Sequence, residues 1–251
     1  PKGITLTKDG VEFLSYARQV VEQTNLLEER YKSHTETREL FSVSSQHYAF
    51  VVNAFVSLLK RADMTRYELF LRETRTYEII EDVKNFRSEI GVLFLNGYNR
   101  DVLTKMFDDN RLTYTSLFKA RPHIFVSKSN PLAKHKVVSL EDLEDFPYLS
   151  YDQGIHNSFY YSEEILSQIP HKKSIVVSDR ATLFNLLIGL DGYTIATGIL
   201  NSNLNGDNIV SIPLDVDDEI DIVYLKHEKA TLSKMGEKFL DNLVKEVTFD
   251  N

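Results

Sequence analysis

The stretch Glu39–Ala62, ELFSVSSQHYAFVVNAFVSLLKRA, contains the pattern that decides the fold. It begins as an extended apolar run, is interrupted at Ser44-Ser45-Gln46 and then continues with apolar residues at helical spacing. A strand, a hydroxyl-lined turn and an amphipathic helix are therefore predicted, with Ser44 or Ser45 as the N-cap of the helix. The apolar face of this helix would consist of Tyr48, Val51, Val52, Phe55, Leu58, Leu59 and Ala62.

A turn of this kind can bind an anion. Free backbone N–H groups and the positive end of the helix dipole point to one place there, and hydroxyl groups add further donors. The same residues also fit an ordinary capped helix that follows a strand and binds nothing.

Strands and helices alternate through the rest of the chain, which is typical of parallel sheets built from βαβ units. The predicted strands include Tyr67–Arg72 and Ile90–Leu95, and a second alternating set starts near Ile124. That second set includes a predicted helix at Ser158–Ile169. Ligands of such sheets bind at the carboxyl ends of the strands, so we expect the loops at those ends to converge on one crevice.

Composition excludes several classes of protein. Hydrophobic residues make up 42% and charged residues 26% of the 251 residues, which is typical of a globular chain. There is no cysteine, so disulfides, thiol chemistry and cysteine zinc sites are excluded. The net charge is 29 − 37 = −8, which disfavours nucleic-acid binding by this part alone. No signal peptide or long apolar run occurs, so we expect a cytoplasmic chain without a membrane partner, and one whose natural N-terminus is missing.

The first predicted helix has a narrow apolar stripe. Its members are alternately four and three residues apart, which is the spacing of a heptad seam. So narrow a stripe predicts pairing with a helix of a second copy, although a helix that lies on its own domain would show a similar pattern. The predicted dimerisation residues are Phe13, Ala17, Val20, Thr24, Leu27 and Tyr31.

The sequence contains little that indicates an enzyme. His227-Glu228 begins like the zinc motif HExxH, but Thr231 stands where the second histidine would be. Neither GxSxG nor GxGxxG occurs, and the seven histidines are scattered. We therefore expect no catalytic residues, no metal site and no cofactor.

The chain resembles LysR-type transcriptional regulators over almost its whole length, and four stretches carry this resemblance. GITLTKDGVEFLSYAR (Gly3–Arg18) resembles the end of the family's winged helix-turn-helix and the start of its linker helix. SEIGVLFL (Ser88–Leu95) resembles a strand of the first lobe. HIFVSKSNPLAKHKVVSLEDLEDFPYLSY (His123–Tyr151) is the most specific stretch, and SDRATLFNLLIGLDGYTIATG (Ser178–Gly198) resembles a helix and glycine turn of the second lobe.

The resemblance implies an α/β fold with two Rossmann-like lobes of periplasmic-binding-protein type II, preceded by a long linker helix. It implies a homodimer or homotetramer that binds operator DNA through the missing N-terminal domain and a small-molecule effector between the lobes. The implied divisions are a wing remnant at residues 1–10, a linker helix at 11–35, a first lobe at 38–119 and 220–248, and a second lobe at 120–219.

The effector cleft is also implied by the resemblance, and its residues suit a small anionic or amino-acid-like metabolite. Arg75 could add a positive charge or be a solvated loop residue, whereas Asp152 could pair with an ammonium group. Two alternatives remain at this point, a solute-binding protein of a transporter and an enzyme on the same scaffold. The implied ligand-binding residues are Ser44, Ser45, Gln46, Thr76, Phe94, Leu95, Tyr151, Asp152, Gln153, Thr197 and Gly198.

Overall fold

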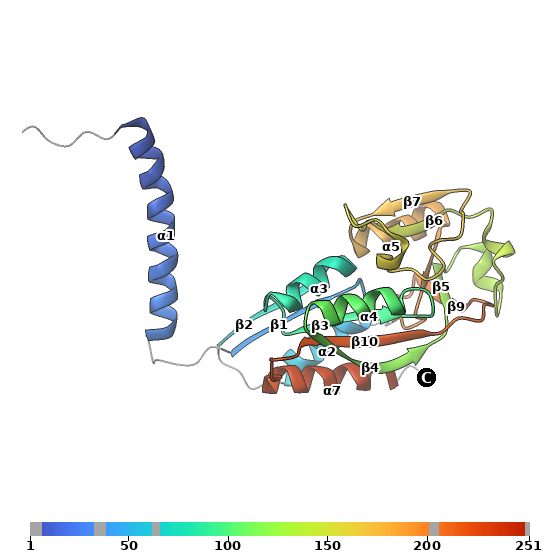
Figure 1. Ribbon diagram of the computed structural model, residues 1–251. Coiled ribbons are helices and arrows are strands. Elements are labelled where there is room, and N and C mark those ends of the chain that lie inside the picture. Colours follow the sequence, from blue (N-terminus) through green and yellow to red (C-terminus); the bar gives the residue numbers. More distant parts are fainter. Residues whose placement is uncertain (1–6, 33–38, 62–65, 201–205, 249–251) are drawn as a thin grey trace, which may run out of the picture. The chain divides into compact units, whose positions relative to one another are not determined.

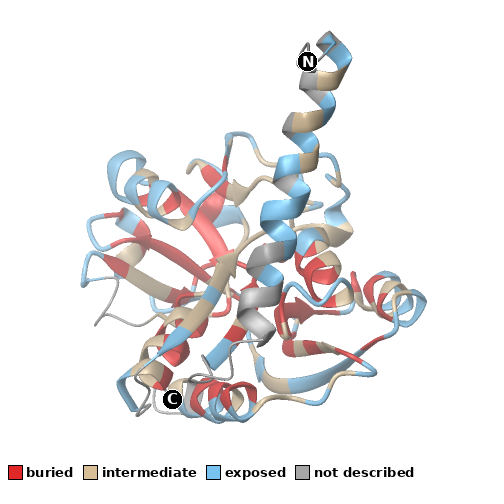
Figure 2. Cartoon of the chain, turned by 90° about the vertical axis from the view of Figure 1, so that its left-hand side faces the viewer, coloured by how far each residue is buried: buried red, intermediate tan, exposed pale blue. Residues whose placement is uncertain are grey.

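The computed structural model describes residues 7–32, 39–61, 66–200 and 206–248 and divides the chain into two units, Pro1–Glu39 and Leu40–Asn251. The first unit contains one long helix, α1 (Lys8–Lys32). Its described side chains are mostly exposed, as the pale blue colour of this helix in Figure 2 shows. None of the helices in the described part of the chain is both long and apolar enough to cross a membrane.

The second unit contains two sheets, each of five strands (Figure 1). In the first sheet the strand order is β2-β1-β3-β10-β4, with β1 and β3 parallel and β10 antiparallel to both of its neighbours. Because β10 lies between β3 and β4, a strand from near the end of the chain completes this sheet. Its strands are β1 (Glu39–Ser45), β2 (Tyr67–Glu73), β3 (Ile90–Leu95), β4 (Leu112–Ala120) and β10 (Ile220–His227).

Helices cover both faces of the first sheet. Strand β3 is buried along its whole length, and its side chains alternate between two hydrophobic clusters. Phe94 packs in the cluster with α2 and α7, whereas Leu95 packs in the cluster with α3 and α4. Figure 1 shows the same arrangement, with each pair of helices on one side of the sheet. The helices are α2 (Ala49–Arg61), α3 (Thr76–Lys84), α4 (Arg100–Asp109) and α7 (Lys234–Thr248).

The second sheet has the strand order β7-β6-β8-β5-β9. The chain enters it between Ala120 and His123 and returns to the first sheet between Pro213 and Ile220. The helix α5 (Arg180–Leu190) packs on it through buried Leu183 and Leu187. Its strands are β5 (His123–Ser127), β6 (Tyr148–Tyr151), β7 (Ser174–Val177), β8 (Tyr193–Ala196) and β9 (Ile209–Pro213), and short 3-10 turns lie at η1 (Pro131–Lys134), η2 (Glu141–Leu143) and η3 (Phe159–Tyr161).

Two local predictions are wrong. The predicted helix Ser158–Ile169 forms only the single turn η3, because its acidic side chains bond to distant parts of the chain. Ser44 and Ser45 do not cap α2, since both belong to β1 and the helix begins three residues after Gln46. The strands and helices on either side of these places lie where the alternating pattern predicts them.

Candidate ligand-binding site

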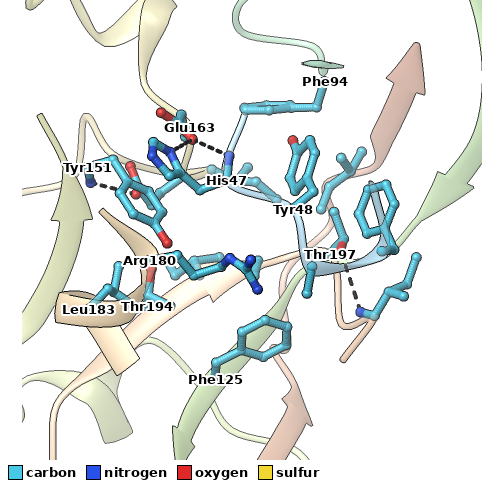
Figure 3. A pocket seen from close by; sticks show the side chains of 18 of the residues that line it. His47, Tyr48, Phe94, Phe125, Tyr151, Glu163, Arg180, Leu183, Thr194 and Thr197 are labelled. Carbon is cyan, nitrogen blue, oxygen red and sulfur yellow. Dashed lines mark hydrogen bonds and ion pairs between the residues drawn. The ribbon is translucent and has the colours of Figure 1, made fainter. Parts of the chain in front are cut away.

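A cavity of about 610 Å³, part of it open to solvent, lies between the two lobes. It is bounded on one side by the turn that precedes α2 and on the other by the ends of β5, β6 and β8 and the start of α5. Figure 3 shows Arg180 extending into this cavity. The lining residues are His47, Tyr48, Ala49, Phe50, Phe94, Phe125, Tyr151, Glu163, Glu164, Ile165, Arg180, Leu183, Phe184, Thr194, Ile195, Ala196, Thr197, Ile199 and Ile220.

One carboxylate of the second lobe occupies the turn before α2. The backbone N–H of His47 donates to Glu163 Oε2 at 2.9 Å, and His47 Nδ1 lies 2.8 Å from the same oxygen. The two side chains are only 7% and 3% exposed. Burial lowers the pKa of His47, but the hydrogen bond and charge of Glu163 outweigh it, so that the pKa is raised overall. A histidine–carboxylate pair, in which the charged form of the ring is favoured, therefore connects the lobes.

The ring of His47 also stacks on Tyr151, with a centroid separation of 4.0 Å and an interplanar angle of 10°. Figure 3 shows these two rings side by side at the edge of the cavity. Since His47 follows β1 and Tyr151 ends β6, this contact joins the ends of strands from both sheets.

A chain of hydrogen bonds runs from this pair into the first lobe. Gln153 Nε2 donates to Glu163 Oε1 at 3.0 Å, while Gln153 Oε1 accepts the backbone N–H of Thr76 at 3.2 Å. The Thr76 hydroxyl accepts a bond from Gln46 Nε2 at 2.6 Å. The start of α3 is thus bound by a side-chain amide of the second lobe, and each of these polar groups has a protein partner.

Two arginines form further ion pairs between the lobes. Arg180, at the start of α5, places Nε and Nη2 at 3.0 and 3.3 Å from the carboxylate oxygens of Glu73. Arg75 places Nη2 2.5 Å from Asp152 Oδ2. A backbone hydrogen bond from Gly154 and the charge of Arg75 keep the pKa of Asp152 below its usual value. Arg75 and Asp152, predicted as separate ligand groups, therefore bind each other.

Glu164 is a second buried carboxyl group beside the cavity. It is 3% exposed, and its Oε1 accepts the backbone N–H of Tyr151 at 2.8 Å. Burial and the neighbouring charge of Glu163 raise the pKa of Glu164 well above its usual value. The uncharged form of Glu164 is therefore favoured relative to that of an exposed glutamate.

Three of the predicted ligand residues, Phe94, Tyr151 and Thr197, line the cavity. The others occupy different places. Ser44 Oγ bonds to Asp82 at 2.7 Å and lies 2.7 Å from Ser88 Oγ, deep in the first lobe. Ser45 is fully buried, and its hydroxyl has no hydrogen-bond partner among the described residues.

The remaining predicted positions support the cavity without lining it. Leu95 packs in the core against α3 and α4, and Gln46 bonds to Thr76, Phe94 and Tyr48. Gly198 has a φ of +82° and approaches His123 closely. Thr76, Asp152 and Gln153 form the ties between the lobes described above.

The side chains of Tyr48, Glu163, Arg180 and Thr194 line the cavity but were not assigned to the site from the sequence. One signal was available for Arg180, because a positive charge at the first residue of a helix opposes the helix dipole and suggests an acidic partner. No local pattern pointed to Glu163, which is 116 residues away from His47.

These features define a two-lobe α/β ligand-binding protein. Residues 44–248 match the LysR substrate binding domain, and the chain belongs to this family. The predicted two-lobe fold of periplasmic-binding-protein type II is thereby confirmed. Members of this family are effector domains of regulators and have no enzymatic activity, so the chain is not an enzyme. A comparison with curated proteins gave no match.

Solved structures of LysR proteins have the same fold. The PA01 protein, a putative LysR family transcriptional regulator from Pseudomonas aeruginosa, is 15% identical, with a TM-score of 0.56 over 98% of this chain and 84% of that one. A full-length BenM mutant is 17% identical, with a TM-score of 0.59 over 100% and 81%. The effector binding domain of QuiR in complex with shikimate is 16% identical, with a TM-score of 0.55 over 83% and 97%.

Proposed function

We propose that the chain is the effector-sensing and oligomerisation part of a LysR-type transcriptional regulator, and that a small molecule binds in the cavity between the lobes. The observation that carries this proposal is the cavity itself, because both lobes supply its walls. A cavity of this size suits a ligand of metabolite dimensions. QuiR, which has the same fold, is in complex with shikimate. Family membership favours a regulator over the solute-binding protein of a transporter.

The residues that would contact the effector are those that line the cavity with polar atoms or large rings. From the predicted set we retain Phe94, Tyr151 and Thr197, and we add Tyr48 and Thr194. The other predicted residues would act indirectly, by holding the two lobes in position around the ligand.

The long helix would associate with a second copy. Phe13, Val20 and Leu27 are 73%, 66% and 58% exposed, and apolar surface of this extent is unfavourable in water. Ala17 and Thr24 belong to the same predicted seam, whereas the side chain of Tyr31 lies outside the described residues. We propose residues 1–10 as the end of a DNA-binding domain, 11–35 as the linker helix, 38–119 with 220–248 as the first lobe, and 120–219 as the second.

Ligand binding would affect DNA binding by changing the relative arrangement of the two lobes. A molecule that contacts both walls stabilises one relative arrangement of the lobes and shifts the population towards it. The shift can be no larger than the difference in affinity for the two arrangements, typically about 1–3 kcal/mol. The whole regulator would be a cytoplasmic dimer or tetramer that binds operator DNA. The coupling energy would change the spacing of its DNA-binding domains.

The test is a metabolite screen by thermal denaturation. At about 100 times its dissociation constant, an effector should stabilise the fold by about 2.7 kcal/mol. Thr194→Phe should abolish that stabilisation because the ring fills part of the cavity. Thr115→Phe is the matched control, since Thr115 is exposed on β4 and does not line the cavity. A ligand that stabilises the Thr194→Phe protein as well as the wild type would show that it binds elsewhere.

A further inference from the structure

We infer, on the basis of the proposed function, that the effector is an uncharged and largely apolar small molecule, because the carboxylate of Glu163 already occupies the anion position at His47. This ligand class differs from the anionic or amino-acid-like metabolite that the sequence suggested. Three features of the wall support it, namely the satisfied carboxylate of Glu163, the paired guanidinium of Arg180 and the apolar lining.

The carboxylate of Glu163 already accepts the hydrogen bonds that the turn before α2 offers to an anion. Its two oxygens accept bonds from the His47 backbone at 2.9 Å and from Gln153 at 3.0 Å, and His47 Nδ1 lies at 2.8 Å. These are the kinds of donor that the carboxylate of a ligand would require at this turn. An anionic ligand would have to displace a buried carboxylate or lie beside it, where like charges repel.

The other charged groups of the wall are already compensated. Arg180 binds both oxygens of Glu73, so that an entering carboxylate would compete with an existing bidentate pair. Glu164 is 3% exposed, its Oε1 already accepts the backbone N–H of Tyr151, and burial raises its pKa, which favours the uncharged form. A cationic ligand would meet the positive charge of Arg180, while the carboxylates of Glu73 and Glu163 already have partners within the protein.

Most of the remaining wall is apolar. Phe94, Phe125, Leu183, Ile195 and Ile220 all line the cavity and are buried. A ring or branched hydrocarbon that covers them gains the free energy of removing apolar surface from water.

Two hydroxyl groups add specificity. Thr194 lies within β8 and Thr197 directly follows it; both line the cavity and are 4% and 6% exposed, respectively. A hydroxyl, carbonyl or amide of a neutral ligand can exchange hydrogen bonds with them without disturbing an ion pair.

The experiment measures binding of matched triplets to the wild-type chain by calorimetry at constant ionic strength. One triplet is 2-phenylethanol, phenylacetate and 2-phenylethylammonium, and equivalent triplets carry a cyclohexyl or an isobutyl group. We expect the neutral member of at least one triplet to bind about tenfold or more tightly than both of its charged partners, since each charged partner disrupts a buried pair. Tighter binding of an anion or a cation, or no binding by any neutral member, would overturn the inference.

A variant tests the part played by Glu163 itself. Glu163→Gln keeps the shape but removes the negative charge that would repel an anion at this turn, so the affinity for phenylacetate should rise relative to that for 2-phenylethanol. Glu144→Gln is the control, because Glu144 is an exposed carboxylate that pairs with Lys172 outside the cavity. An unchanged ratio in Glu163→Gln would contradict the role of Glu163. The wild-type triplets remain decisive if the variant does not fold.

The outcomes separate this inference from the proposed function. An anion that binds the wild type but not Thr194→Phe would leave the cavity as the effector site and show that the ligand class is wrong. Binding that Thr194→Phe does not weaken would instead show that the cavity is not the effector site.

Discussion

His47 and Glu163 lie on different lobes, and a single carboxylate oxygen of Glu163 is within hydrogen-bonding distance of both the backbone N–H and Nδ1 of His47, at 2.9 and 2.8 Å. The protein thus supplies its own anion to the turn that the sequence suggested as an anion site. The ends of the two sheets are joined there by groups of the protein itself.

This pair makes stability depend on pH. The pKa of His47 is raised in the folded chain, so its contribution is fully present below the unfolded pKa of 6.5 and is lost as pH rises through the higher folded pKa. Glu73 also raises this pKa and Arg180 lowers it, while Tyr151 stacks on the ring. The free energy of unfolding, measured with urea, should therefore show a contribution from His47 that favours pH 6 over pH 8.

The Glu163→Gln variant should reverse the sign of that contribution. Without the carboxylate, burial is the dominant influence and lowers the pKa of His47, so the unfolded state binds the proton more readily. The variant should also be less stable at pH 6 by about 1–3 kcal/mol, the usual cost of losing a buried hydrogen bond to a charged group. A pH dependence identical to that of the wild type would contradict the assignment.

Ser44 should prove to be a structural residue. Its hydroxyl donates to Asp82, which is 3% exposed, and Ser44→Ala leaves that carboxylate with one bond fewer. We expect a loss of about 1.5–3 kcal/mol in the free energy of unfolding. Ser158→Ala, at an exposed position without a side-chain cap bond, should change stability very little. Equal effects of the two substitutions in urea denaturation would count against the role of Ser44.

Gly198 should tolerate no side chain. Its φ is +82°, and an added Cβ would lie 2.5 Å from His123 Nδ1. Gly198→Ala should therefore destabilise the fold by about 1–3 kcal/mol through backbone strain and displacement of the histidine ring. Gly97→Ala is the matched control, because an added Cβ there meets nothing within 4 Å. Thermal denaturation of both variants would check the difference.

Substitutions on α1 should separate the copies of the chain. Val20→Glu together with Leu27→Glu would place charges in the proposed seam, where they would be buried without partners. Sedimentation velocity should then show a smaller species than the wild type does. Gln23→Glu adds a charge at another exposed position of α1 and should leave the mass unchanged. Retention of the wild-type mass by the double variant would exclude the seam.

The helices and strands could be predicted from the sequence where the local residue pattern and the packing agree. Strand β3 is apolar throughout because helices cover both of its faces, and α2 has the predicted apolar spacing because one face packs on the sheet. The segment Ser158–Ile169 has a composition that suits a helix, yet Glu163 and Glu164 bond to His47 and Tyr151. Contacts with distant residues override local propensity there.

The site was predictable only in part for the same reason. Phe94, Tyr151 and Thr197 line the cavity, and the resemblance to LysR-type regulators had implied all three. The partners of Glu163 and Arg180 are 116 and 107 residues away, respectively, and no spacing in the sequence pairs them. The resemblance also implied Ser44 and Asp152, whose side chains instead bind Asp82 and Arg75.

The position of β10 between β3 and β4 has a consequence for biosynthesis. All strands of the second sheet, from His123 to Pro213, leave the ribosome before Ile220 does. The second lobe can therefore form its sheet while the first still lacks a central strand and exposes the edges of β3 and β4. Such edges pair readily with other chains, so a nascent chain that stalls before Ile220 is the form most exposed to aggregation and most in need of a chaperone.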